Sequence, residues 1–148
     1  MKKLIILLAI VWFAIPAQAQ LTIKGGLACK KDAPTQTVVT GQYHVGYGVI
    51  SSDLYIPHCK NEGNSFSGRA GFYLGGDWLN FVIDIVGLYE HKEFRGGYGI
   101  EVNFQFLRPI GIFARWAQTH PVYNQNGCTA VWWTDRTQEM IFGVLISI

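Results

Sequence analysis

Residues 79–106 read LNFVIDIVGLYEHKEFRGGYGIEVNFQF, and apolar and polar residues alternate along most of this segment. Between residues 79 and 90, Leu79, Phe81 and Ile83 begin one apolar face, while Asn80 and Asp84 lie on the other. After a short polar break, one face carries Tyr98, Ile100, Val102, Phe104 and Phe106. A period of two is typical of β-strands, because successive side chains point to opposite faces. The segment therefore predicts two long strands joined by a short loop, as a hairpin.

Similar alternation along the rest of the chain predicts eight strands in all. The expected strands are 21–27, 39–50, 54–58, 66–74, 79–89, 95–106, 110–118 and 138–148. Tight turns are expected at 51–53, 75–77 and 107–109, and longer loops at 29–37, 59–65, 90–94 and 119–137. In an up-and-down meander, the turns then fall at one end and the loops at the other. This asymmetry is typical of transmembrane barrels in bacterial outer membranes.

The start of the chain has the three parts of a secretory signal peptide. Lys2 and Lys3 precede an apolar run over residues 4–15, and Ala17-Gln18-Ala19 forms a small-residue cleavage site. The run is too short for a transmembrane helix, which needs about 20 residues. We therefore expect residues 1–19 to be a signal peptide and residues 20–148 to be one mature domain.

Charge and hydrophobicity exclude some classes of protein. Without Lys2 and Lys3, the ten remaining Lys and Arg residues equal the ten Asp and Glu residues, so a nucleic-acid partner has no electrostatic support. No apolar stretch after residue 19 is long enough to cross a bilayer as a helix, although nearly half of the chain is hydrophobic. If the chain enters a membrane, it must do so as a β-barrel.

Alternation alone does not say which face of the barrel points inwards. A soluble lipocalin-like barrel places its apolar face around a ligand, whereas a membrane barrel turns that face to lipid. The polar face lacks the many lysines of a soluble surface. It also carries glycines that suit a narrow lumen: Gly46, Gly48, Gly71, Gly97, Gly99, Gly111 and Gly143. We therefore predict an all-β, eight-stranded antiparallel up-and-down transmembrane β-barrel.

In this arrangement, charged side chains on the polar face lie in the lumen. The expected members are Arg69, Asp84, Arg95, Glu101, Arg115 and Glu139. Buried charges must be paired, and three arginines with three acids permit this balance. We interpret the set as an ion-pair plug, so a passive pore is not expected. Aromatic residues near strand ends suit the interfaces of a membrane: Trp78, Phe104, Phe106 and Trp116.

With its signal peptide, eight strands, short turns, long loops and terminal apolar strand, the chain resembles the small OmpA/OmpX-like outer-membrane β-barrel proteins. It is similar in style to the single-domain outer membrane β-barrel proteins common in Bacteroidetes. The resemblance is architectural and covers the whole mature chain, without a diagnostic motif. It implies insertion by the barrel assembly machinery through the last strand, EMIFGVLISI at residues 139–148, although Ile148 stands where this signal usually has an aromatic residue.

The resemblance also implies a location in the bacterial outer membrane, in contact with its lipid. Roles within the family are membrane integrity, adhesion, narrow pores and, in some branches, lipid A modification. We expect a structural or surface-interacting role without catalysis. A secreted soluble barrel that binds an apolar ligand, and a lipid-modifying enzyme, are the alternatives.

Three cysteines, Cys29, Cys59 and Cys128, fall in or beside the long loops at one end. In an oxidising compartment two of them can pair and one remains. The sequence leaves all three pairings open.

The histidines at the same end, His58, His91 and His120, fit no metal motif by their spacing, so neither a metal nor a cofactor is expected. Ser67 with His91 and Glu90 loosely meets the needs of a lipid A deacylase. However, the serine deacylases of this barrel type carry histidine and serine close together on one strand, and this chain has no such pair.

Aromatic residues in the last long loop are the candidates for contact with a partner. Trp132 and Trp133, with Tyr123, are residues of the kind that anchors a protein or a glycan. Alternatively, they pack over the barrel mouth or dip into the outer leaflet.

Overall fold

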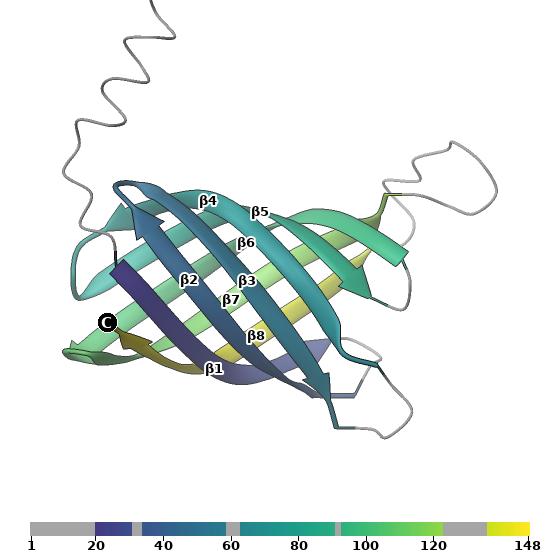
Figure 1. Cartoon of the computed structure of the whole chain (residues 1–148), viewed down its shortest axis with the longest axis horizontal. Coiled ribbons are helices and arrows are strands. Elements are labelled where there is room, and N and C mark those ends of the chain that lie inside the picture. Colours follow the sequence, from purple (N-terminus) through teal and green to yellow (C-terminus); the bar gives the residue numbers. More distant parts are fainter. Residues whose placement is uncertain (1–19, 31–33, 59–62, 91–92, 123–135) are drawn as a thin grey trace, which may run out of the picture.

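The computed structural model describes residues 20–30, 34–58, 63–90, 93–122 and 136–148. Eight strands close into one barrel in which each strand is antiparallel to its neighbours and β8 pairs with β1 (Figure 1). The strands are β1 (Gln20–Lys30), β2 (Gln36–Val45), β3 (Gly48–Pro57), β4 (Ser65–Gly75), β5 (Leu79–Glu90), β6 (Glu93–Leu107), β7 (Ile110–Pro121) and β8 (Thr137–Ser147). Within these ranges, no helix has the length and apolar character to cross a membrane.

The two ends of the barrel differ, as the sequence predicts. Short connections join β2 to β3, β4 to β5 and β6 to β7, and all three lie at the left end in Figure 1. The start of β1 and the end of β8 lie at this same end, which we call the turn end. The opposite end, which we call the loop end, holds the end of β7 and the start of β8, which are separated by the longest interval between consecutive strands.

The predicted turn at residues 51–53 is wrong. The chain turns at Gly46–Tyr47 instead, where Gly46 has a φ of 57°, and Val45 pairs with Gly48 across the turn. A two-residue turn exchanges odd and even positions between the two faces. In an unbroken strand over residues 39–50, Val49 would share the outer face with Val39 and Tyr43. After the turn it points into the lumen instead and is only 3% exposed.

Several strands extend further than predicted at the loop end. Cys29 belongs to β1, Thr37 to β2, and Thr119 and His120 to β7, although all four were expected in loops. The connection between β5 and β6 is also shorter than expected, because Glu90 pairs with Glu93. Strand pairing thus continues to the rim wherever two neighbouring strands still face each other.

Apolar side chains cover the outside of the barrel and charged side chains lie within it. Along β5, Ile83 and Ile85 are 49% and 69% exposed, whereas Asn80 and Asp84 on the opposite face are 6% and 3% exposed. The other strands repeat this alternation in their burial. A soluble ligand-binding barrel requires the opposite arrangement, with the apolar face inside.

Two glycines on the inner face allow neighbouring strands to approach closely. A Cβ atom on Gly143 would lie 2.1 Å from the carbonyl oxygen of Gly25 on β1, and one on Gly71 would lie 2.2 Å from that of Ile83 on β5. Real Cβ atoms essentially never make such contacts. These positions therefore need glycine where the sheet bends into a narrow barrel.

We predict that Gly143→Ala lowers the free energy of unfolding by about 1–3 kcal/mol, because the added methyl group forces β1 and β8 apart. Gly68→Ala is the matched control, since a Cβ atom there meets nothing within 4 Å. Urea unfolding of the refolded barrels, followed by tryptophan fluorescence, measures both. Equal midpoints for the two variants would contradict this account.

Candidate functional site

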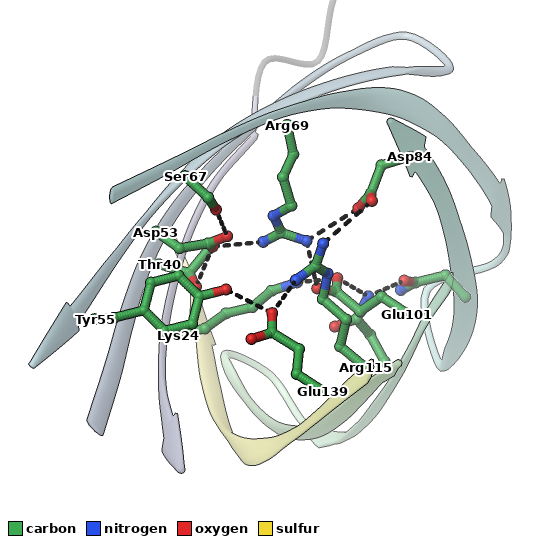
Figure 2. A network of polar contacts seen from close by, with 12 residues as sticks. Lys24, Thr40, Asp53, Tyr55, Ser67, Arg69, Asp84, Glu101, Arg115 and Glu139 are labelled. Carbon is green, nitrogen blue, oxygen red and sulfur yellow. Dashed lines mark hydrogen bonds and ion pairs between the residues drawn. The ribbon is translucent and has the colours of Figure 1, made fainter. Parts of the chain in front are cut away.

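Arg69 on β4 lies at the centre of the lumen and contacts three carboxylates from three other strands (Figure 2). Its Nη2 is 2.9 Å from Oδ1 of Asp53, and its Nη1 is 3.1 Å from both Oδ2 of Asp84 and Oε2 of Glu101. The side chains of these four residues are at most 2% exposed. A guanidinium suits this position because its planar fork presents several N–H donors in fixed directions.

Two further cations extend the contacts across the lumen. Arg115 on β7 lies 3.3 Å from Asp84 and 3.5 Å from Glu139, measured between Nη2 and Oδ1 and between Nη1 and Oε1. Lys24 on β1 is paired with Glu101. Together with Arg69 these contacts join residues of seven strands into what we call the lumen network: Lys24, Asp53, Arg69, Asp84, Glu101, Arg115 and Glu139.

Neutral side chains also donate hydrogen bonds to three carboxylates of the network. Thr40 donates to Asp53 at 2.7 Å, and Ser67 donates to the other oxygen of the same carboxylate. The Tyr55 hydroxyl donates to Glu139 at 2.7 Å, and the Asn103 amide donates to Glu101 at 2.9 Å. Such bonds replace water around charges that the barrel keeps dehydrated.

Gly99 makes room for the network. A Cβ atom at this position would lie 2.7 Å from Oδ1 of Asp84 and 3.0 Å from Nη2 of Arg115. Gly99 pairs with Asp84 across β5 and β6, so a larger side chain would occupy the space in which the carboxylate and the guanidinium meet. This position on the polar face therefore requires glycine because Asp84 and Arg115 meet beside it.

The charges of the network nearly balance. Four carboxylates face Lys24 and two arginines, and Lys30 on β1 lies 4.0 Å from Glu139. Lys30 also contacts Glu90 at 2.5 Å, near the loop end of the lumen. Because each carboxylate has at least one cation nearby, the arrangement holds strands together and fills the middle of the lumen.

The structure brings together five of the six predicted lumen residues. Arg95 instead lies towards the loop end, where its Nη2 donates to Thr137 at 2.8 Å and its Nη1 is 3.9 Å from Glu93. The alternation along β6 places Arg95 and Glu101 on the same face and does not show that they lie at different levels along the barrel axis. The strand register shows it, because Arg95 pairs with Pro121 whereas Glu101 pairs with Arg115.

The sequence-based prediction missed Lys24 and Asp53 as members of the lumen network and Tyr55 as a hydrogen-bond donor to it. Lys24 alternates with Leu21 and Ile23 and so falls on the polar face, but the expected set of lumen charges did not include it. Asp53 and Tyr55 were missed because the predicted turn at residues 51–53 hid the alternation of β3. Read as one strand, Val49, Ser51, Asp53 and Tyr55 all face inwards, which is the signal that could have identified them.

Several predicted candidates lie outside the described residues: the signal peptide, Cys59, His91, Tyr123, Cys128, Trp132 and Trp133. Of the other loop-end candidates, Cys29 has an exposed side chain at the end of β1, and His58 lies 2.8 Å from the Thr37 hydroxyl. His120 is buried, with its Nε2 3.3 Å from the Gln118 amide. Within the described ranges, no group of three His, Cys, Asp or Glu residues is arranged to hold a metal.

Of the residues suggested for a deacylase site, Ser67 and Glu90 lie in the described part of the chain, and their contacts do not favour Ser67 as a nucleophile. Ser67 is 4% exposed and donates its proton to Asp53 deep in the lumen. Glu90 is paired with Lys30 rather than directed at Ser67. A serine in this setting acts as a hydrogen-bond donor to a structural carboxylate.

We predict that Arg69→Leu lowers the free energy of unfolding by about 3–5 kcal/mol, because it leaves buried carboxylates without their shared cation. Arg108→Leu is the control, since the pair of Arg108 with Asp77 is exposed and such pairs contribute about 0–1 kcal/mol. Urea titration of both variants in the same detergent gives the comparison. Similar losses for the two arginines would show that burial does not decide the cost.

Comparison with known proteins gives a fold rather than a family. No protein-family model and no curated protein sequence matches the chain. Among solved structures, a protein from work titled "De novo design of transmembrane beta-barrels" is similar, with a TM-score of 0.67 and 11% sequence identity, covering 87% of this chain and 95% of that one. The chain is thus an eight-stranded antiparallel β-barrel with the fold of a designed transmembrane barrel.

Proposed function

We propose that this protein is a small, non-enzymatic outer-membrane β-barrel of the OmpA/OmpX-like kind, with a structural or surface-interacting role. The observation that carries the proposal is the division of its side chains, apolar outside and ion-paired within. A barrel of this kind satisfies its backbone groups between strands and presents an apolar wall to lipid.

The outer wall supports insertion into a bilayer. Its middle carries aliphatic side chains such as Ile83, Ile100 and Val144. Exposed aromatic side chains lie towards the turn end at Tyr43, Tyr47, Trp78, Phe104 and Phe106, and towards the loop end at Phe66, Tyr89 and Phe94. Trp116 is an exception to the predicted belts, because it pairs with Ile100 midway along β7. Aromatic residues at two levels suit the two membrane interfaces.

The lumen network supports a role without transport or catalysis. Its residues are at most 5% exposed and cross-link seven strands, which leaves little room for a continuous water path. The same contacts occupy Ser67, the only serine that we considered as a nucleophile. We infer that these cross-links make the barrel wall rigid.

The proposed orientation places the turns in the periplasm and the longer loops outside the cell. Insertion then proceeds through the barrel assembly machinery after removal of residues 1–19. Contact with an extracellular protein or glycan falls to the last loop, where Tyr123, Trp132 and Trp133 are the candidates. Alanine substitution of both tryptophans, followed by a cell-adhesion assay, tests this part.

Cell fractionation and gel shift test the central proposal. We expect the mature protein in the outer-membrane fraction, with a band that migrates differently before and after boiling. Ile100→Arg, at mid-barrel, should reduce stability in lipid by about 2–4 kcal/mol, whereas Leu107→Arg, at the turn end of the same strand, should cost about 0–1 kcal/mol. A protein found soluble in the periplasm, or equal costs for the two variants, would overturn the membrane assignment.

A second expectation concerns ion flow. Because paired side chains fill the middle of the lumen, the reconstituted wild-type barrel should show no steady conductance in planar bilayers. A parallel recording with a large porin verifies that the bilayer reports open channels. Stable conductance steps of the wild-type protein would show that the network leaves a path for ions.

A further inference from the structure

A polar cavity of about 560 Å³ occupies the turn end of the lumen. It extends from Lys24, a member of the lumen network, to Arg108 and Pro109 in the turn between β6 and β7. Its volume lies within the range of about 300–1,000 Å³ that is usual for small-molecule sites. The side chains that matter for its chemistry are Gln42, His44, Tyr73, Asn80, Asn103 and Gln105.

The charged residues that line this cavity have partners of opposite sign. Lys24 is paired with Glu101 at the inner end, and Arg108 is paired with Asp77 at the exposed rim. The remaining polar lining consists mainly of carboxamides and hydroxyls. A neutral ligand therefore fits this cavity better than an ion, because it requires no further charge to be dehydrated.

Gln42 is the side chain that points to a ligand. It is 1% exposed, lies on the inner face of β2 and lines the cavity, yet neither its amide nitrogen nor its amide oxygen has a hydrogen-bond partner. Oδ1 of Asn103, on the same cavity, also lacks a partner. Leaving buried amides unpaired is costly, so these groups are expected to bind a molecule that supplies both donors and acceptors.

The neighbouring rings add an apolar surface. His44 and Tyr73 meet edge to face with their centroids 5.1 Å apart, beside the carboxamides. Hydroxyl groups both donate and accept, which matches the two ends of a carboxamide, and the C–H face of a sugar ring packs on aromatic surfaces. Carboxamides with an adjacent aromatic pair thus match the chemistry of a sugar.

We propose that the turn-end cavity binds a short neutral saccharide, with Gln42 as its hydrogen-bonding anchor. The site lies at the opposite end of the barrel from the end of β7 and the start of β8, so it is separate from the surface contact proposed above. It also does not depend on the cellular location of the barrel. Success or failure of binding is therefore distinguishable from success or failure of the membrane assignment.

The experiment titrates N,N′-diacetylchitobiose, and separately cellobiose, into the refolded mature barrel in dodecylphosphocholine, a detergent without a sugar headgroup. Isothermal titration calorimetry gives the affinity, and the side-chain amide resonances of ¹⁵N-labelled wild-type protein locate the site. We expect saturable binding of at least one disaccharide, with shifts of the Gln42 and Asn103 amide signals.

Gln42→Leu should weaken this binding at least tenfold. Gln36→Leu is the matched control and should bind as the wild type does, because Gln36 is a buried glutamine on the same strand at the loop end. Heat-modifiable gel migration verifies that both variants are folded. If Gln42→Leu does not fold, the amide shifts of the wild-type protein decide.

Three results would overturn the proposal. The first is that neither disaccharide binds even at concentrations well above about 1 mM, since a dissociation constant of that size is already weak for a specific site. The second is unchanged affinity in Gln42→Leu. The third is binding of inorganic phosphate in the same titration without binding of either sugar, which would make the cavity an anion site.

Discussion

A closed barrel of eight strands encloses a space that its own side chains just fill, and here the central filler is a dehydrated guanidinium. Arg69 binds Asp53, Asp84 and Glu101, which come from three different strands. Each carboxylate reaches Arg69 only in one register, because a slip of one residue would turn it to the outer face. The charges therefore specify how the strands align, in addition to the hydrogen bonds between them. Because pairing offsets a large dehydration cost, the net stability gained is smaller than the number of contacts suggests.

The parts of the fold that the sequence predicted correctly are those with long, unbroken alternation. The hairpin of β5 and β6 and the outward faces of β4, β7 and β8 all follow from the period of two. The region of β2 and β3 did not follow. Ser51, Ser52 and Asp53 are residues typical of turns, but Ser51 and Asp53 are polar here because they face the lumen. Conversely, the real turn at Gly46–Tyr47 continues the alternation of its flanks and leaves no break in the pattern.

The candidate site could be predicted in kind but not in detail. Charges on the inner face had to be paired, so a network was foreseeable from Arg69, Glu101 and Arg115 alone. Which charges pair depends on the level of each residue along the barrel axis. That level is set by how neighbouring strands are offset from each other, and the odd–even alternation of a single strand does not reveal it. For this reason alternation alone did not separate Arg95, which lies towards the loop end, from the charges at the centre. The cavity around Gln42 was not foreseeable either, since its lining comes from several strands and from the turn between β6 and β7.

The pairing of β8 with β1 has a consequence for how the chain matures. Glu139 is the partner of Arg115 and Tyr55, and it arrives on the last strand. Until that strand docks, an arginine and a tyrosine on earlier strands face the lumen without this acceptor. Contacts between residues so distant along the chain slow folding, because the whole segment between them must be brought into place before they form. The pairing of β8 with β1 and the completion of the lumen network are thus a single late event. A chain truncated before β8 could complete neither the barrel nor the network.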